Sequence, residues 1–272
     1  RDGTLWAWGR NDKGQLGNTA TAERRTPGQV NGLTGVTAIA AGTYHTLVLK
    51  DDGTVWAWGS NSNGQLGDGT TVDRGTPVRV PGLSGITAVA AGLMHSLALK
   101  QDGTVWAWGG NDRGQLGDGT TVDLGTPLQV KGLTGIAAVA AGSRHSVVTK
   151  SDGTVWAWGM NDSGQLGDET AVDRSLPTQS IQLSGITTLV AADELNLALK
   201  QDRTVWAWGD NFEGQVGDGT LRNKRSTAAP IGGLTGVTAI AAGWQHAIAL
   251  TQDGNVWAWG SNRAGQPGNG SM

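Results

Sequence analysis

The sequence predicts an all-β fold, a β-propeller made of tandem repeats of about 50 residues, and three observations support it. The tetrapeptide Trp-Ala-Trp-Gly recurs six times at a nearly constant step, glycine-rich turns flank each copy, and no segment has helical periodicity. The first Trp of each copy is Trp6, Trp56, Trp106, Trp156, Trp206 or Trp257. Such a period indicates one supersecondary unit repeated along the chain. We therefore expect residues 1–272 to form a single array whose repeats start near positions 3, 53, 103, 153, 203 and 254.

The second repeat shows how one unit divides into four antiparallel strands. Residues 86–91 are a short apolar run that predicts the first strand, and residues 95–100 predict the second. Asp102-Gly103 then provides the positive φ of a tight hairpin turn before the third strand, residues 104–109. A long connection leads to a weaker fourth strand at residues 127–130, where a proline suits the edge of a sheet. Four antiparallel strands per repeat are typical of a propeller blade.

The paired tryptophans explain how neighbouring blades pack. Side chains alternate along a strand, so Trp106 and Trp108 share one face while Val105 and Ala107 share the other. A large face against a small face interdigitates well, and we expect both Trp side chains of every pair to lie between blades. An aromatic cage for a ligand is the less favoured interpretation, because one identical pair per blade is what a core needs.

The repeat motifs resemble those of a known family. The second repeat reads Ala-Gly-x-x-His-Ser-Leu-Ala-Leu-Lys at residues 91–100, Asp-Gly-Thr-Val-Trp-Ala-Trp-Gly-x-Asn at 102–111 and Gly-Gln-Leu-Gly at 114–117. These motifs, which recur over essentially the whole chain, are similar to the regulator of chromosome condensation repeat in the style of bacterial members. The resemblance implies a propeller, usually of seven blades. It implies no single function, because members include a GTPase exchange factor, a plant photoreceptor and a β-lactamase inhibitor.

The number of repeats departs from the family pattern. The sequence contains six third strands but only five of each other kind, about five and a half repeats. The chain is therefore expected to be a closed small ring, a fragment of a seven-bladed propeller, or an array completed by strands of another copy. We expect it to be a mature or trimmed piece of a longer protein. An open end would expose a Trp-lined face and an unpaired strand edge, which favour assembly.

Composition excludes several classes of partner and site. The net charge of -3 gives no reason to expect a nucleic-acid surface, and the apolar runs are too short for membrane insertion. Cys is absent, so the chain has no thiolate metal site and no cysteine nucleophile. The expected partner is a protein or a second copy of the chain. We expect an extracellular or cell-surface location, with a cytoplasmic one left open.

Two recurring polar residues are interpreted as structural. A His opens the second strand in four copies, and we expect Asn196 in its place in the fifth. One His per blade is too widely spaced for zinc, whose ligands must meet at one ion. An Asn precedes each Gly-Gln-Leu-Gly turn, where turn chemistry explains it better than a calcium loop, whose spacing differs. These positions are His45, His95, His145 and His246, then Asn11, Asn61, Asn111, Asn161, Asn211 and Asn262.

No catalytic motif accompanies the repeats. A nucleophile elbow, a phosphate-binding glycine loop and a paired-carboxylate motif are all absent from the sequence, so we expect no enzyme activity, cofactor or metal. The exchange-factor function requires an insertion that these even repeats lack. The photoreceptor function requires a Trp cluster directly after Ala-Gly. Only Trp244 stands there, and we expect Glu194 at the same position in the fifth copy.

The repeats differ mainly in two short connections. One lies between Ala-Gly and His, and the other follows the third strand. Strand direction alternates, so both should emerge on one side of the disc, where loops commonly carry recognition residues. The candidate partner-binding residues are Tyr44, Met94, Arg144, Phe212 and Trp244. Aromatic and Arg side chains are the usual anchors of an interface. Neutral drift at exposed positions is the alternative explanation.

The fifth repeat is the least regular. Asp193, Arg203 and Gln182 are expected to replace glycines, which indicates either a distorted blade or one that faces a partner. A nearby loop with Arg222, Lys224 and Arg225 is interpreted as solvated.

The sequence therefore predicts a non-enzymatic protein-binding or scaffold propeller that uses one loop face. The alternative is a structural subunit of a bacterial surface layer or filament, assembled through open blade edges. Inhibition of a β-lactamase is a weaker third possibility, because it rests on the fold alone.

Overall fold

The computed structural model describes residues 3–20, 22–181, 183–268 and 270, and these form β-strands joined by turns and loops. The first sheet pairs β1 (Leu5–Gly9) with β2 (Arg24–Val30). Four complete sheets follow, and the last sheet has three strands. The complete sheets are β3 (Val36–Ala41), β4 (His45–Lys50), β5 (Val55–Gly59) and β6 (Arg74–Arg79); β7 (Ile86–Ala91), β8 (His95–Lys100), β9 (Val105–Gly109) and β10 (Leu124–Gln129); β11 (Ile136–Ala141), β12 (His145–Lys150), β13 (Val155–Gly159) and β14 (Arg174–Gln179); and β15 (Ile186–Ala192), β16 (Leu195–Lys200), β17 (Val205–Gly209) and β18 (Arg225–Pro230). The last sheet is β19 (Val237–Ala242), β20 (His246–Thr251) and β21 (Val256–Gly260).

The sheets confirm the predicted four-stranded repeat. Within each complete sheet the strands follow one another in chain order and pair antiparallel. The two-stranded first sheet supplies a third and a fourth strand, and the last sheet supplies a first, second and third. Six third strands and five of each other kind are present, as the sequence indicates.

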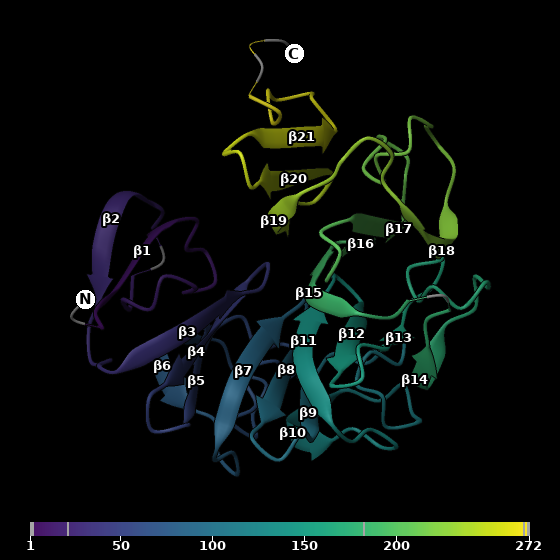
Figure 1. Ribbon diagram of the computed structural model, residues 1–272. Helices are drawn as coiled ribbons and strands as arrows, with labels where there is room; N and C mark the ends of the chain where they lie inside the picture. The colour runs from purple at the N-terminus through teal and green to yellow at the C-terminus, as the bar shows by residue number, and fades with distance from the viewer. Residues whose placement is uncertain (1–2, 21, 182, 269, 271–272) are drawn as a thin grey trace.

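The sheets stand side by side in an arc around a central axis (Figure 1). The first strand of each repeat, such as β7 or β11, lies toward the centre, and the fourth lies toward the rim. The sheet of β1 and β2 and the sheet of β19–β21 lie at the two ends of the arc and do not pair with each other. The array is therefore open in this structure, in contrast to the closed small ring that the sequence left as an alternative.

The second Trp of each pair holds neighbouring repeats together. Trp108 is fully buried, and its indole Nε1 donates a hydrogen bond of 2.9 Å to the carbonyl oxygen of Gln65 in the preceding repeat. The same bond joins Trp58 to Gln15, Trp158 to Gln115, Trp208 to Gln165 and Trp259 to Gln215. Each bond satisfies a buried indole N–H with a backbone carbonyl oxygen of the preceding repeat. These bonds fix each blade against the next.

The first Trp of each pair is less buried than the sequence predicts. Trp156 is half-buried, and the ammonium of Lys150 lies 5.0 Å from its ring. The first member still lies between blades, since Trp156 packs against a core cluster that contains Leu97 and Val105 of the preceding blade, but it is only partly buried there. At the end of the arc, where no preceding blade covers them, Trp6 and Trp8 are 52% and 59% exposed.

The irregular repeat is the sheet of β15–β18, and we keep the name fifth repeat for it, counting the sheet of β1 and β2 as the first. It keeps its four strands in the common order, so the blade is not distorted as a whole. Its irregularity is local. Arg203 adopts a φ of +64° at the hairpin turn where the preceding repeats have Gly103 and Gly153, as predicted for a poor turn residue. Gln182, which the sequence also singles out, lies outside the described residues.

Candidate functional site

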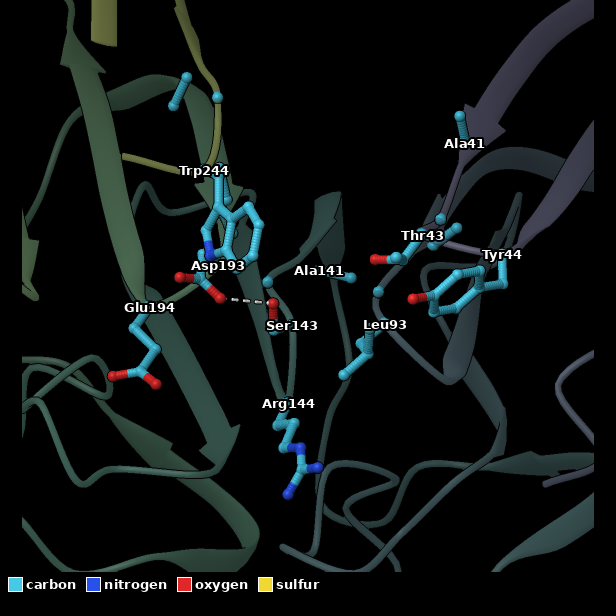
Figure 2. Close-up of a pocket in the computed structure, with 18 of the residues that line it drawn as sticks. Ala41, Thr43, Tyr44, Leu93, Ala141, Ser143, Arg144, Asp193, Glu194 and Trp244 are labelled. Carbon is cyan, nitrogen blue, oxygen red and sulfur yellow. Dashed lines mark hydrogen bonds between the residues drawn. The ribbon is translucent and has the colours of Figure 1, made fainter. Parts of the chain in front are cut away.

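A hollow of about 740 Å³ opens at the centre of one side of the arc. The turns between the first and second strands of five repeats line it, together with Arg10 and Met160 from the connections that follow third strands. Both variable connections therefore emerge on the same side, as the alternation of strand direction predicts. We call this hollow the channel mouth (Figure 2).

The structure brings three of the five candidate residues into the channel mouth. Tyr44, Arg144 and Trp244 line it, with Tyr44 and Trp244 on opposite sides in Figure 2. Trp244 is 74% exposed, although it is a large aromatic side chain. Met94 and Phe212 are not among the lining residues. Phe212 instead stacks with a neighbouring cation, since the guanidinium of Arg222 lies 5.4 Å from its ring.

Buried histidines form the wall beneath the mouth. The Nε2 of His45 lies 3.0 Å from Ser96 Oγ in the next repeat, and that hydroxyl donates to the carbonyl of Gln65 at 2.8 Å. The hydroxyl has a single proton, so it accepts from Nε2, and the other ring nitrogen, Nδ1, is left bare and without a partner. His95 bonds Ser146 in the same way, and His145 bonds Asn196.

This environment keeps the three histidines neutral. Burial lowers the pKa of His45 and of His145 to about 4. Burial, together with repulsion from His145 and His45, lowers the pKa of His95 to about 3. Protonation would place a second N–H in a buried position with no acceptor. The structural role predicted for these residues, as opposed to a metal site, agrees with this geometry.

Each of these histidines also requires a glycine beside it. A Cβ atom added to Gly42 would lie 2.5 Å from His45 Cε1 and 2.6 Å from the carbonyl oxygen of Gly92. No side chain fits there while the imidazole is present. The Ala-Gly-x-x-His motif is therefore a packing unit, in which the glycine makes room for the ring.

The fifth repeat lacks this glycine–histidine pair. Its strand register also shows that the alignment of this repeat with the others, as predicted from the sequence, is one residue out. Leu195 pairs with Gly209 as His145 pairs with Gly159, so Leu195 replaces the histidine and Asn196 replaces the serine. The prediction that Asn196 occupies the histidine position is therefore wrong. Ala192, and not Asp193, stands where the other repeats have glycine. The residue directly after that position is Asp193, so the prediction of Glu194 at this position is also wrong.

The exchange to Leu195 reshapes the turn above it. β15 extends to Ala192, which pairs with Leu195, and a two-residue turn of Asp193 and Glu194 connects β15 to β16. Asp193 adopts a φ of +50°, which Asp and Asn tolerate better than most residues. This turn places two carboxylates in the lining of the mouth.

Both carboxylates are half-buried and bonded to hydroxyl groups. Ser143 Oγ donates to Asp193 Oδ1 at 2.7 Å, and Ser163 Oγ donates to Glu194 Oε2 at 2.5 Å. Burial raises the pKa of Asp193 despite these donors. Burial and the negative charges of Asp193 and Asp210 raise the pKa of Glu194. Among the described residues no Lys or Arg forms an ion pair with either carboxylate.

The cations of the mouth are already paired. Arg144 Nη1 lies 3.0 Å from Asp112 Oδ2. Arg10 Nε lies 2.6 Å from Asp12 Oδ1, and its guanidinium stacks 5.1 Å from the ring of Tyr44. Charge is therefore distributed unequally around the mouth. Arg144 and Arg10 are paired with carboxylates, whereas the two carboxylates of the fifth repeat have no ion pair within the described part of the chain.

The recurring Asn residues form hydrogen bonds with the backbone of their own loops. Asn61 accepts a bond from Leu66 N at 2.9 Å through Oδ1 and donates to the carbonyl oxygens of Thr70 and Val72 through Nδ2. No group of three or more His, Asp or Glu side chains that could hold a metal ion occurs within the part of the chain that the structure describes. The described residues also contain no helix of the length and apolar character that crossing a bilayer requires.

Comparison with known proteins identifies related sequences and structures. A family model for the RCC1-like domain matches residues 1–272. A protein RCC2 homolog from Danio rerio is 45% identical over 53 residues, which are 19% of this chain and 11% of that protein. The chain therefore matches only about a tenth of the length of this curated relative.

Solved structures extend the similarity to the whole arc. Prp20p from Saccharomyces cerevisiae is 25% identical with a TM-score of 0.84, and the match covers 99% of this chain and 70% of that one. Human WBSCR16 has a TM-score of 0.83 at 23% identity, over 94% of this chain and 74% of that one, and shares the fold.

Proposed function

The chain belongs to the RCC1-like domain family, and from this premise we propose that it is a non-enzymatic protein-binding scaffold whose channel mouth receives side chains of a partner protein. The observation that carries the proposal is the hollow of about 740 Å³ lined by the positions at which the repeats differ. A concave site on a rigid scaffold, with exposed aromatic and charged side chains, is the usual form of a recognition surface.

The similar proteins support a binding function without naming the partner. Prp20p is described by its binding to Gsp1p and histones, so a propeller of similar structure binds proteins. The partner of the present chain need not be either of these. The alternative of a surface-layer or filament subunit has no support among the similar proteins. The bacterial origin and the extracellular or cell-surface location stay predictions.

Selection of peptides tests the proposal directly. The purified 272-residue chain is immobilised and used to select from a phage-displayed library of random 12-residue peptides. We expect enrichment of a limited set of sequences. Tyr44→Ala together with Trp244→Ala should abolish their binding, because these side chains lie on opposite sides of the mouth.

A matched variant controls for surface changes elsewhere. Gln101→Ala together with Gln201→Ala alters two exposed hairpin residues at the other end of the second strands, and it should leave binding unchanged. Thermal unfolding of each variant checks that the fold is intact. A library that yields no enriched peptide, or peptides that bind the Tyr44 and Trp244 variant as well as the original chain, contradicts the proposal.

A further inference from the structure

The channel mouth contains two carboxylates that no ion pair of the described residues neutralises. Asp193 and Glu194 are half-buried, and their direct donors are neutral: Ser143 and Trp244 for Asp193, and Ser163 for Glu194. Elsewhere in the same repeats, half-buried carboxylates have a guanidinium beside them, such as Asp168 with Arg174 at 2.9 Å. A half-buried carboxylate without a counter-charge loses solvation that a ligand cation would restore.

An exposed aromatic side chain lies beside this charge. Figure 2 shows the indole of Trp244 next to the Asp193 carboxylate, and the Trp244 side chain is largely exposed. An indole is the strongest aromatic acceptor for a cation, and an Arg guanidinium stacks on it flat. Ser143 bonds Oδ1 of Asp193, and Trp244 also donates to this carboxylate. A carboxylate offers about four acceptor positions, so it can still accept a further N–H donor.

The positive groups of the mouth do not compete for this position. Arg144 is held by Asp112, and Arg10 is held by Asp12. The nearest basic loop is engaged as well, since Arg225 pairs with Asp218 at 2.6 Å and Lys224 Nζ donates to the carbonyl of Asp162 at 2.8 Å. Lys224 acts on Glu194 only through space and forms no ion pair with it, and no cation of the described residues is paired with Asp193. A ligand cation would therefore supply the first direct ion pair of this turn.

The loop that contacts Glu194 contains a buried amide nitrogen without a hydrogen-bond acceptor among the described residues. Gln165 is fully buried, and its Oε1 accepts a bond from Ser163 N at 2.8 Å, but its Nε2 has no acceptor. In another repeat the corresponding nitrogen, Gln115 Nε2, bonds Asp112 at 3.1 Å. Gln165 does not line the mouth, so this nitrogen marks a packing difference of the loop and takes no part in the proposed contact.

We propose that the channel mouth binds an arginine side chain of a partner protein, with the guanidinium against the ring of Trp244 and hydrogen-bonded to Asp193, and with Glu194 adding negative charge from the flank. This inference rests on the proposed function and specifies the chemistry of its partner. It assigns the irregular fifth repeat a role in recognition.

The peptides selected on the chain provide the probe. We expect arginine at one fixed position of the enriched sequences. Replacement of that arginine by citrulline, which keeps the shape and removes the charge, should weaken binding about tenfold or more, as should Asp193→Asn in the protein. Lysine should bind less well than arginine, because an ammonium cannot stack flat or donate in parallel pairs. Affinity is measured by fluorescence polarisation of labelled peptides.

Combining the citrulline peptide with the Asp193→Asn variant tests whether the arginine and Asp193 are in direct contact. Citrulline peptide should bind the Asp193→Asn variant as well as it binds the original chain, because the contact is already absent. Asn tolerates positive φ, so this variant should keep the turn and the temperature of unfolding. Glu23→Gln is the matched control, since it removes an exposed carboxylate that does not line the mouth, and it should not change affinity.

Three results would overturn parts of the account, and they are distinguishable. Peptides that require Trp244 but show no arginine preference and bind Asp193→Asn equally well contradict this inference and leave the proposed function standing. Equal binding of lysine and arginine contradicts the guanidinium assignment. The absence of any enriched peptide contradicts the proposed function itself.

Discussion

The turn between β3 and β4 and the turn between β15 and β16 occupy the same place in their repeats but are built differently. In the first, Gly42 leaves room for the buried ring of His45, whose Nε2 reaches Ser96 of the next repeat. In the second, Ala192 and Leu195 replace the glycine and the histidine. Leu195 then packs in one cluster with Ala247, which stands at the serine position of the following repeat.

The comparison shows that three positions change together. Once the histidine is absent, the glycine is no longer required and the serine loses its partner, so an apolar set replaces a polar one. The turn above the apolar set closes with two residues, which are free to carry the carboxylates of the mouth. The packing beneath these turns is therefore coupled to the residues that we propose as the recognition site.

The largest expected effect is a loss of folding stability in acid, which comes from the repeats with a buried histidine and not from the fifth repeat. The pKa values of His45, His95 and His145 lie below the ordinary value of 6.5, so the unfolded chain binds more protons than the folded chain between about pH 6.5 and 4. Stability is fully present above pH 6.5 and falls as the pH falls, by about 1.4 kcal/mol per pH unit for each group.

Urea unfolding at a series of pH values measures this slope. His95→Gln removes one of the three titrating groups, so it should reduce the histidine part of the slope by about a third. Carboxylates such as Asp218, whose pKa is lowered to about 2, lose their contribution mainly below pH 4. Asp193 and Glu194, whose pKa values are raised, contribute with the opposite sign but equally in both proteins, so the difference between the two slopes reports the histidine. A slope that does not change in the variant would show that the histidines do not control acid stability.

Disrupting the contact between the glycine and the histidine should cause the next largest loss of folding stability. Gly42→Ala places a Cβ 2.5 Å from His45 Cε1 and should destabilise the fold by about 2–3 kcal/mol. Adding His45→Leu, which imitates the fifth repeat, should recover about 1 kcal/mol or more of the loss. Recovery is partial because the Gly92 carbonyl lies 2.6 Å away. Strict additivity in this double-mutant cycle, measured by chemical unfolding, would refute the coupling. Ala192→Gly, the reverse change, should cost less than about 1 kcal/mol.

The hairpin turn of the fifth repeat should give the smallest effect. Arg203 has a φ of +64°, so Arg203→Gly should relieve backbone strain and stabilise the fold by about 1 kcal/mol. The lost hydrogen bond from Arg203 to Gln252 offsets part of this gain. Gly254→Ala is the matched control, because φ there is +85° and no atom lies within 4 Å of the added Cβ. It should destabilise by a similar amount, and a lower unfolding temperature for Arg203→Gly would oppose the strain explanation.

The fold could be predicted because it depends on periodicity. The step of the Trp pairs defines the repeat, and alternation within a strand defines the two faces. The hydrogen bond from Trp108 to Gln65 could not be predicted, because its acceptor is a backbone carbonyl in another repeat. The lesser burial of Trp156 was missed for a related reason, since the coverage of a face depends on the shape of the neighbouring blade.

The site was predicted in part. The sequence identified Tyr44, Arg144 and Trp244 through their variability, and the structure places all three in the mouth. It did not identify the turn at Asp193, because Ala191-Ala192-Asp193 matches the Ala-Ala-Gly of the other repeats and this match shifts the alignment by one residue. Counting backward from Lys200, which keeps its place in every copy except the last, would have aligned Leu195 with the histidines.

The most direct test of the central claim is a crystal structure of the chain with one arginine-containing peptide selected on it. We expect the guanidinium between the indole of Trp244 and the carboxylate of Asp193, inside the hollow of about 740 Å³. A peptide bound on the opposite side of the arc, or on the exposed face of β19–β21, would contradict the account.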